Sequence, residues 1–300
     1  MKIIVIGKNG QLGKAFFQLV KKNKKKDKFY FISREDLNLE SKKSICKYFK
    51  KNFFDIIINC AAYTKVDDAE KNFKIANKVN HLSVSTLAKI VKNYHSKLIH
   101  ISTDYVFSGK LNKNYKESDI PKPINVYGKT KLAGEKAIKK IMKKNSIIIR
   151  SSWIYSEFGK NFLKTIIKAA TKKREINIVN DQFGSPTNAN DLARAIFKVI
   201  NNNNFRIKNF PSDIYHFSNT GSTSWYLFAK EIFKLKRINC KINQINSIEN
   251  NSLALRPKNT SLNIDKIVTN FKIKPLNWKK SLKNFLFDES NSIPVNKKFE

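Results

Sequence analysis

The sequence has few of the residues that build disulfide frameworks, zinc sites or membrane spans. Only three cysteines occur among its 300 residues, and none belongs to a C-x-x-C pair, which argues against disulfides and structural zinc. No apolar run approaches the roughly 20 residues that span a bilayer. The four aliphatic residues before Gly7 are too few for a signal-peptide core. We therefore expect a cytoplasmic protein with no membrane partner.

Acidic residues are scarce as well. The 59 basic side chains outnumber 23 acidic ones and give a formal net charge of +36, a balance that also occurs in nucleic-acid-binding proteins. Here the lysines are spread along the chain, and only seven basic residues are arginine, the type suited to bidentate phosphate and base contacts. We expect no nucleic-acid partner, but a general electrostatic attraction for anionic substrates.

Glycine is the third scarce residue, and its distribution is uneven. Three of the nine glycines, Gly7, Gly10 and Gly13, fall in "GKNGQLG", directly after the apolar run 3–6. Glycines at such a point allow a tight turn and let a phosphate approach the N-terminus of the following helix. Their spacing resembles the nucleotide-binding variant of the extended short-chain dehydrogenases/reductases. A packing turn without a ligand is the alternative.

Short apolar runs alternate with amphipathic segments over the first half of the chain. The runs are rich in β-branched residues and lack polar alternation, as in strands buried on both faces of a parallel sheet; they cover 3–6, 29–32, 55–62, 97–103 and 146–152. Between them, apolar residues recur at helical spacing. This alternation predicts an α/β protein with a doubly wound, Rossmann-like parallel sheet.

The pattern loosens after about residue 150. Helical stretches are expected at 161–173, 190–201 and 224–236, separated by short strands and polar loops. We predict a nucleotide-binding domain over residues 1–152 and a smaller mixed α/β substrate domain over 153–288, some segments of which pack back on the first domain. Residues 289–300 are expected to form a polar tail.

Tyr127 and Lys131 stand four residues apart on a predicted helix, a spacing that places both on one face. A nearby ammonium would lower the pKa of the phenol and suit it to acid–base chemistry. In a chain this rich in lysine the spacing also arises by chance, and Tyr226 and Lys230 repeat it. The second pair has no partner at a strand end, so we interpret it as ordinary helix packing.

Polar residues follow two predicted strands at the edge where ligands bind in open α/β sheets. Thr103 and Asp104 end the fourth strand, and Thr103 could donate a hydrogen bond to a substrate carbonyl; a purely structural role is the alternative. Arg34 follows the second strand, where a cation suits the 2′-phosphate of NADPH. A solvated surface cation explains Arg34 equally well.

Eight motifs, in order along residues 1–288, resemble the dTDP-4-dehydrorhamnose reductase family of the extended short-chain dehydrogenases/reductases. They are "GKNGQLG", "NCAAYTKVDDAE", "STDYVFSG", "YGKTKLAGE", "RSSWIY", "DQFGSPT", "GSTSWY" and "LRPKNTSL". The glycine turn and the Tyr/Lys pair are common to the superfamily, whereas "DQFGSPT" and "RPKNTSL" are narrower. Tyr105 stands where the related dehydratases carry Glu, which favours a reductase.

The resemblance implies reduction of the C4 keto group of dTDP-4-dehydro-β-L-rhamnose to dTDP-β-L-rhamnose by NADPH or NADH, the last step in making this sugar nucleotide for cell-surface polysaccharide. Tyr127 would protonate the C4 oxygen, Lys131 would lower its pKa and hold the nicotinamide ribose, and Thr103 would polarise the carbonyl. The implied cofactor contacts are Gly10, Gln11, Leu12, Asn38, Leu39, Ala62, Tyr63 and Thr64. The implied substrate contacts are Asp104, Trp153 and Arg256.

Two departures from the family and two alternative functions stay open. Asn38 replaces a common Asp on the adenine side. Ala15 and Asn190 stand where some relatives bind Mg²⁺ through acidic residues, so we assign no metal ligand and leave Mg²⁺ and a metal-linked homodimer in question. A non-catalytic, NADP-binding regulatory subunit of the same fold is one alternative. A related sugar-nucleotide reductase or epimerase is the other.

Overall fold

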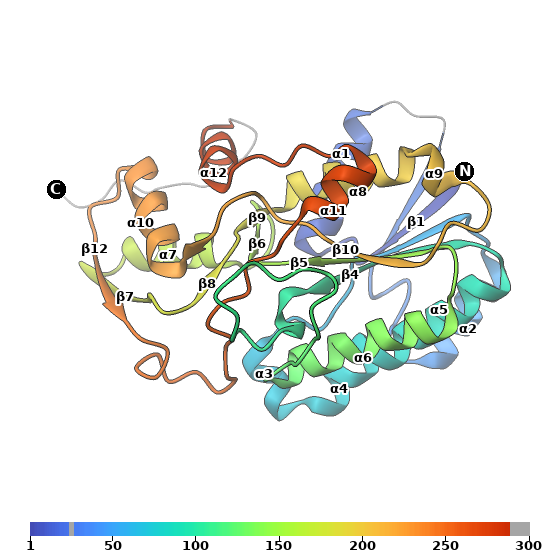
Figure 1. The fold of residues 1–300 in the computed structure, drawn as a ribbon, viewed down its shortest axis with the longest axis horizontal. Coiled ribbons are helices and arrows are strands. Elements are labelled where there is room, and N and C mark those ends of the chain that lie inside the picture. Colours follow the sequence, from blue (N-terminus) through green and yellow to red (C-terminus); the bar gives the residue numbers. More distant parts are fainter. Residues whose placement is uncertain (24–26, 289–300) are drawn as a thin grey trace.

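A six-stranded parallel sheet forms the centre of the larger lobe. The computed structural model describes residues 1–23 and 27–288. Its main sheet has the strand order β10-β5-β4-β3-β1-β2, and every neighbouring pair is parallel. The strands are β1 Lys2–Ile6, β2 Lys28–Ile32, β3 Ile56–Asn59, β4 Lys97–Thr103, β5 Ser146–Ser151 and β10 Asp213–His216. The predicted doubly wound α/β sheet is confirmed (Figure 1).

Helices cover both faces of this sheet (Figure 1). One layer holds α1 Gln11–Lys22, α8 Ala189–Asn201, α9 Asn203–Arg206 and α11 Asp265–Phe271. The other holds α2 Lys42–Lys51, α3 Val66–Lys71, α4 Phe73–Asn77, the π-helical turn η1 Lys78–Leu82, α5 Ser83–Asn93 and α6 Val126–Ile141. A 3₁₀ turn, η2 Asp104–Val106, follows β4 directly. Because the six strands are parallel, their carboxyl ends lie at one common edge of the sheet.

Two cores share the strands because successive side chains point to opposite faces. Ile3 and Val5 of β1 belong to the core under α1 and α8, whereas Ile4 and Ile6 belong to the core under α2, α5 and α6. All seven residues of β4 are buried. A central strand of a parallel sheet is buried on both faces in this way, and β4 is so although it carries Lys97 and His100.

A smaller lobe lies beside the sheet (Figure 1). It contains α7 Phe162–Ala170, β7 Glu175–Val179, α10 Trp225–Lys236, β12 Lys241–Ile245 and α12 Trp278–Phe287, and it has a core of its own. Its strands form three two-stranded pairs: β12 with β7, β11 Thr223–Ser224 with β8 Phe183–Gly184, and β6 Ile154–Tyr155 with β9 Thr187–Asn188.

Segments that follow residue 153 enter both lobes. The strand β10 joins β5 at the edge of the main sheet, and α8 packs against α1. The division of the chain at residue 152 stays a prediction. The expected polar tail, residues 289–300, lies outside the described residues.

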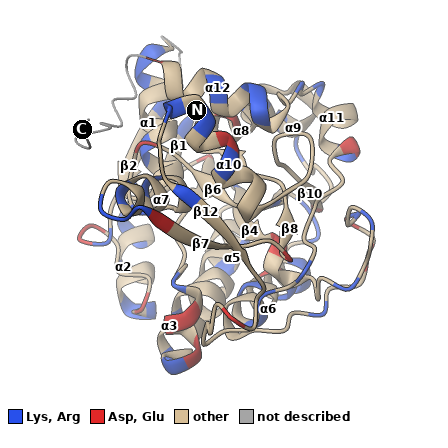
Figure 2. Cartoon of the chain, turned by 90° about the vertical axis from the view of Figure 1, so that its left-hand side faces the viewer, with Lys and Arg blue, Asp and Glu red and all other residues tan. Residues whose placement is uncertain are grey.

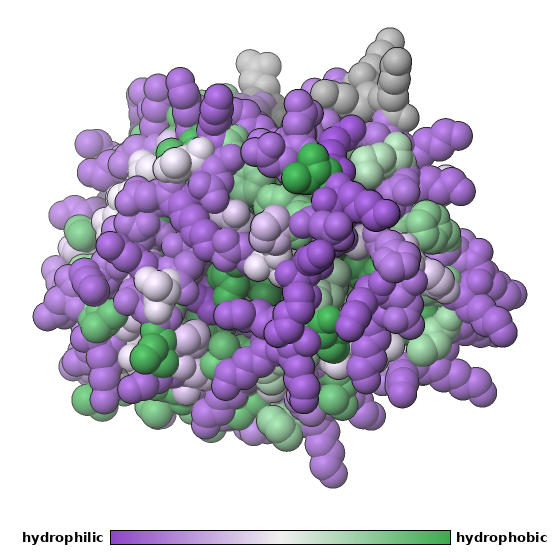
Figure 3. Space-filling view, turned by 45° about the vertical axis from the view of Figure 1, so that its right-hand side comes forward, coloured by the Kyte–Doolittle hydropathy of each residue, from purple (hydrophilic) through white to green (hydrophobic). Residues whose placement is uncertain are grey.

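Lysine and arginine residues are spread over many elements, as the colouring in Figure 2 shows. On the face drawn in Figure 3, hydrophilic residues cover most of the surface and apolar residues lie between them in small groups. No helix in the described part of the chain is both long and apolar enough to cross a membrane.

Candidate active site

The glycine-rich turn joins β1 to α1 at the carboxyl edge of the sheet. Gly7 has a φ of +97°, which favours glycine, and its Cα lies so close to β3 that an added Cβ would be 2.8 Å from the Ala61 nitrogen. A Cβ on Gly13 would lie 2.1 Å from the Gly7 carbonyl oxygen. The helix α1 begins after Gly10 with no side-chain cap. Its first N–H groups are therefore available to an anion.

Two residues of this turn, both expected to contact a cofactor, point in different directions. The Leu12 side chain is buried in the core, which leaves only its backbone for a ligand. The Gln11 amide reaches the smaller lobe, where its Oε1 accepts hydrogen bonds from Ser156 Oγ at 3.0 Å and Asn161 Nδ2 at 2.9 Å. Gln11 therefore connects the glycine turn to the second lobe, a contact that the sequence analysis did not predict.

The end of β2 presents Arg34 at the surface. Its side chain is 75% exposed and forms an ion pair with Glu40 at 2.5 Å. Asn38 is exposed and accepts a hydrogen bond from the Glu40 backbone nitrogen at 3.0 Å, whereas the Leu39 side chain is buried. An exposed ion pair contributes little to stability, so Arg34 is free to exchange its partner for another anion.

The segment after β3 forms the next wall of this edge. Ala62 and Tyr63 are partly buried and Thr64 is exposed. Asn80 holds the Tyr63 backbone on both sides, since its Oδ1 accepts from the Tyr63 nitrogen at 2.8 Å and its Nδ2 donates to the Tyr63 oxygen at 3.1 Å. The Tyr63 hydroxyl donates to Asp68, and this bond raises the pKa of the phenol to about 12.

Thr103 and Asp104 lie buried at the end of β4. Thr103 Oγ1 donates to Asp104 Oδ1 at 2.9 Å and accepts from the Tyr105 nitrogen at 3.2 Å. Burial raises the pKa of Asp104 to about 6, although the hydrogen bond from Thr103 acts in the opposite direction. The carboxyl group is therefore poised to titrate just below neutral pH.

Tyr127 stands in the first turn of α6, which begins at Asn125, whose side chain accepts from the Gly128 nitrogen at 2.8 Å. The Tyr127 ring packs edge-on against Tyr105, with centroids 5.8 Å apart. Burial raises the pKa of Tyr127 to about 12, and interaction with the Thr103 hydroxyl only partly offsets this effect. The pKa therefore moves opposite to the predicted direction, and Lys131 is not among the groups that lower it.

Lys131 lies beneath Tyr127 and is 1% exposed. Its Nζ donates to the Ile101 carbonyl oxygen at 2.6 Å and lies 3.4 Å from His100 Nε2. Burial lowers the pKa of this amine to about 8, against the opposing charge of Glu135. The structure thus brings the predicted catalytic residues together: the Tyr127 phenol lies close enough to the Thr103 hydroxyl to interact with it, and Lys131 lies one helical turn farther along α6.

Comparison with known proteins shows the family to which the chain belongs. A family model described as the RmlD substrate binding domain matches residues 1–291 of the chain. The chain belongs to this RmlD family. The dTDP-4-dehydrorhamnose reductase of Aggregatibacter actinomycetemcomitans is 36% identical over 295 residues, which cover 94% of this chain and 97% of the relative. The family resemblance predicted from the motifs is confirmed.

Two solved structures of similar proteins have the same fold. A dTDP-4-dehydrorhamnose reductase from Clostridium acetobutylicum superposes with a TM-score of 0.89 at 34% identity, covering 95% of this chain and 98% of its own. One from Bacillus anthracis, solved in complex with NADP, superposes with a TM-score of 0.87 at 35% identity and the same coverage. The described fold is therefore the one that experimental structures of RmlD-family reductases adopt.

A buried charge network supports the RmlD-family site from below, and the sequence analysis missed it. Arg150 of β5 binds Glu135 of α6 through two hydrogen bonds of 2.9 and 2.6 Å, and Ser102 Oγ donates to Glu135 at 2.5 Å. Asn59 Nδ2 donates to His100 Nδ1 at 3.2 Å. One signal could have revealed this network: a charged or imidazole side chain inside an apolar run, as in "KLIHIST" and "SIIIR".

The predicted substrate residues occupy two places in this RmlD-family protein. Arg256 makes a bidentate ion pair with Asp67, at 2.8 and 2.6 Å, and so attaches the loop before α11 to α3. Both residues line a hollow of about 540 Å³. Trp153 follows β5 and stacks on Trp225 of the smaller lobe.

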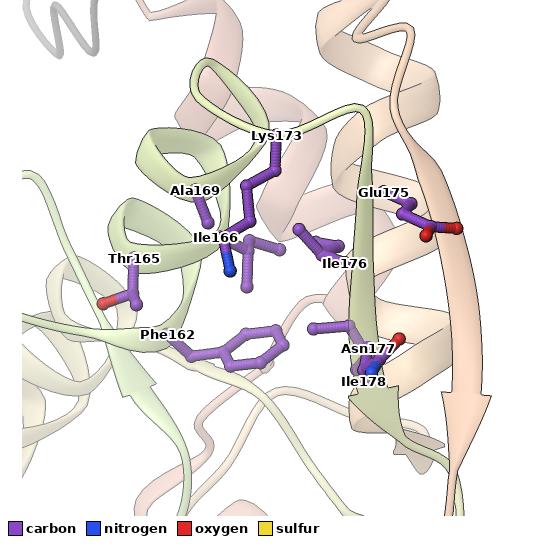
Figure 4. Close-up of a pocket in the computed structure, with 9 residues that line it drawn as sticks. All are labelled: Phe162, Thr165, Ile166, Ala169, Lys173, Glu175, Ile176, Asn177 and Ile178. Atoms are coloured by element: carbon purple, nitrogen blue, oxygen red, sulfur yellow. The ribbon is translucent and has the colours of Figure 1, made fainter.

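A second hollow of about 500 Å³ lies in the smaller lobe between α7 and β7. Figure 4 shows the Phe162 ring pointing across it toward β7. None of the predicted site residues lines this hollow. The hollow beside Arg256 is lined by one predicted substrate residue and is therefore the better candidate for a ligand.

Metal ligands are not grouped in the described structure of this RmlD-family protein. Among residues 1–23 and 27–288, no three His, Cys, Asp or Glu side chains are arranged to hold a metal ion. Ala15 is buried in the main core, where it has no oxygen to offer, and Asn190 stands in the first turn of α8.

Proposed function

We propose that the protein reduces the C4 keto group of dTDP-4-dehydro-β-L-rhamnose and forms dTDP-β-L-rhamnose, with a nicotinamide cofactor as reductant. The observation that carries this proposal is the grouping of Thr103, Tyr127 and the buried Lys131 at the end of β4 and the start of α6, in a chain of the RmlD family. The relatives named dTDP-4-dehydrorhamnose reductase support the substrate, and the NADP complex of one of them supports the cofactor.

The turn after β1 fits a dinucleotide. Gly7 and Gly13 leave no room for a Cβ, and the uncapped start of α1 offers N–H groups to a pyrophosphate. Gly10, Gln11 and Leu12 would hold the pyrophosphate through their backbones. Arg34 would exchange Glu40 for a 2′-phosphate, which favours NADPH over NADH. When bound, the cofactor supplies the hydride for C4.

The remaining adenine-side and wall residues would enclose the dinucleotide. Asn38 and Leu39 would face the adenine, and Ala62, Tyr63 and Thr64 would line the side formed by β3. Asn80 fixes the backbone of this wall through two hydrogen bonds. A wall fixed in this way loses little conformational freedom on binding.

Tyr127 is suited to donate the proton that reduction requires. The phenol is protonated at neutral pH and so has a proton to give, but its raised pKa, about 12, makes it a weaker acid, and transfer would require a cation that stabilises the phenolate. The phenol would donate this proton to the C4 oxygen, while the Thr103 hydroxyl would turn from Asp104 to donate a second hydrogen bond to the same oxygen and polarise the carbonyl.

Lys131 would stabilise the phenolate that remains on Tyr127. With a pKa of about 8 the amine is mostly protonated at neutral pH, and its positive charge in a dry site attracts a nearby anion strongly. The Ile101 carbonyl holds the Nζ at 2.6 Å, which limits its movement. The same amine would hold the nicotinamide ribose.

The substrate would lie across the two lobes, with Asp104, Trp153 and Arg256 in contact with it. This placement accords with a division near residue 152 into a cofactor-binding and a substrate-binding part. We also propose a homodimer in the cytoplasm, and Mg²⁺ stays in question. Size-exclusion chromatography with and without EDTA tests whether a dimer forms and whether it depends on a metal ion, and NADPH consumption in EDTA tests whether the activity does.

The deciding experiment mixes purified protein, NADPH and dTDP-4-dehydrorhamnose, and follows the nicotinamide absorbance. We expect one NADPH to be consumed per sugar, with dTDP-β-L-rhamnose identified by NMR. Tight NADPH binding without turnover would instead support a regulatory subunit. A C4-epimeric product would support a related sugar-nucleotide reductase.

A further inference from the structure

Trp153 has an unusual backbone conformation. Its φ is +46°, in the left-handed region that a bulky L-residue rarely adopts. Such conformations persist where the surrounding structure imposes them, and they concentrate at functional sites. The question is which contacts impose this one.

The indole of Trp225 is the first of these contacts. The two ring systems are stacked, with centroids 3.5 Å apart and planes inclined by 5°. The Phe162 ring packs against Trp225 at 4.3 Å, so Trp225 is itself supported by α7. One face of Trp153 is thus covered by an aromatic platform from the smaller lobe.

Gly184 supplies the second contact. A Cβ at this position would lie 2.6 Å from Trp153 Cε2 and 2.7 Å from Nε1, closer than packed atoms approach. Any other residue at 184 would therefore displace the indole. Because a side chain is absent at 184, the Trp153 ring can lie against the backbone of β8.

One small sheet holds both contacts in register. The strand β8 pairs with β11, with Gly184 opposite Thr223 and Phe183 opposite Ser224, and Trp225 follows β11 immediately. Three of the motifs that carry the family resemblance, "RSSWIY", "DQFGSPT" and "GSTSWY", thus supply the three members of one stack.

The stack adjoins the catalytic strand. Ser151 of β5 is the register partner of Thr103 of β4, and Trp153 is two residues farther along the chain. The Ser152 hydroxyl donates to the Ser185 carbonyl oxygen at 2.6 Å, which joins the end of β5 to the segment after Gly184. A displacement of the indole would therefore occur beside the bound sugar and leave Tyr127 and Lys131 in place.

We propose that Trp225 and Gly184 are positioning residues that fix the Trp153 indole as a rigid wall against the sugar of the nucleotide-sugar substrate. This inference rests on the proposed function, which places Trp153 in contact with substrate. Trp225 and Gly184 do not touch the reacting atoms. Their effect is expected on substrate affinity, and the turnover rate should change little.

The test compares Trp225→Leu, Trp225→Phe and Gly184→Ala with wild type, and uses Tyr226→Phe as the matched control on the same helix. Loss of the aromatic platform in Trp225→Leu should raise KM for the nucleotide sugar about threefold to tenfold, the range that an aromatic pair is worth. Gly184→Ala should raise it about tenfold through overpacking. Trp225→Phe keeps a flat ring and should retain most of the affinity for the nucleotide sugar.

A second readout separates this inference from the proposed reaction. Calorimetry measures the Kd of dTDP-rhamnose and of NADPH for each variant, whether or not turnover occurs. We expect the dTDP-rhamnose Kd to rise with KM, the NADPH Kd to stay within twofold, and the near-ultraviolet circular dichroism of the indole pair to change in Trp225→Leu and Gly184→Ala.

An unchanged dTDP-rhamnose Kd in folded Trp225→Leu would overturn the positioning role, as would a wild type that does not bind dTDP-rhamnose. A kcat that falls as much as KM rises would also overturn it. Wild type that binds dTDP-rhamnose but consumes no NADPH would overturn the reductase proposal alone, and the Kd ratios would still decide the role of Trp225.

Discussion

Two tyrosine–lysine pairs with the same four-residue spacing lie in this molecule, and their surroundings differ. Lys131, on α6, is 1% exposed and donates to the Ile101 carbonyl, and the Tyr127 ring one turn earlier packs against Tyr105. Lys230, on α10, is exposed, and its Nζ lies 5.9 Å from the centre of the Tyr226 ring. Local spacing is therefore the same, and the difference comes from what tertiary packing places around each pair.

The comparison shows what burial adds to a pair of functional groups. Around Tyr127 and Lys131, removal from water raises the pKa of the acid and lowers the pKa of the amine, so both groups move away from their ordinary values. A cation near a ring on an exposed helix contributes only weakly.

The largest effect is expected at the two tyrosines. Tyr127→Phe removes the proton donor and should lower kcat about 10³-fold, a typical contribution of a general acid. Tyr226→Phe should leave kcat within twofold. Steady-state kinetics with dTDP-4-dehydrorhamnose measure both, and fluorescence titration checks that NADPH still binds. Equal activity of the two variants would remove the distinction between the pairs.

The two lysines should differ by a smaller factor. Lys131→Met removes the buried charge that stabilises the Tyr127 phenolate and should lower kcat about 10²-fold. Lys230→Met is the matched control and should change kcat less than twofold. A Lys131→Met enzyme with wild-type kcat would show that the ammonium takes no part in the reaction.

Substitution of Asp104 tests the surroundings of Tyr127, because the ionisation of this buried carboxyl makes the stability of the fold depend on pH. Its pKa of about 6 in the folded protein lies above the ordinary value of 3.8, so the folded state binds the proton more tightly. Stability from this group is present below about pH 4 and is lost as the pH rises through 6. Asp104→Asn avoids this loss. Its free energy of unfolding, relative to that of wild type, should therefore rise by about 2 kcal/mol between pH 4.5 and pH 7.5.

Urea unfolding at the two pH values measures that difference. The comparison between variant and wild type cancels the titration of groups that both proteins share. A difference that is the same at both pH values would mean that Asp104 ionises normally. For the control Tyr226→Phe, the difference in free energy of unfolding from wild type should not depend on pH.

The smallest effect concerns the exposed lysines. Because the net charge of +36 attracts anions at a distance, kcat/KM for the dTDP-sugar should fall about threefold between 50 and 500 mM NaCl. The buried pair is screened little, so kcat should stay nearly constant. A parallel fall of kcat would indicate that salt reaches the Lys131 site.

The sequence predicted the parallel sheet well because buried parallel strands have a strong local pattern. The expected runs 97–103 and 55–62 correspond to β4, Lys97–Thr103, and β3, Ile56–Asn59. The strand β10, with the sequence "DIYH", was not predicted. It has only four residues and a mixed pattern, and its place in the sheet depends on pairing with β5.

The candidate site was predicted by position more successfully than by chemistry. Thr103, Tyr127 and Lys131 lie together as expected, but the direction of the Tyr127 pKa was wrong because a sequence does not report burial. The partners of Gln11 and Arg256 are far away in the chain: Asn161 is 150 residues from Gln11, and Asp67 is 189 residues from Arg256. No local pattern encodes such contacts.

The late arrival of β10 in the main sheet bears on how the chain folds. During synthesis the first five strands emerge well before residues 213–216, so the edge of β5 lacks its partner over that interval. An unpaired edge strand is open to pairing with other chains. A fragment ending at residue 152 would keep that open edge and would also lack α8, which covers α1. The larger lobe therefore becomes a complete folding unit only when the segment through Phe271, which includes β10 and α11, has left the ribosome.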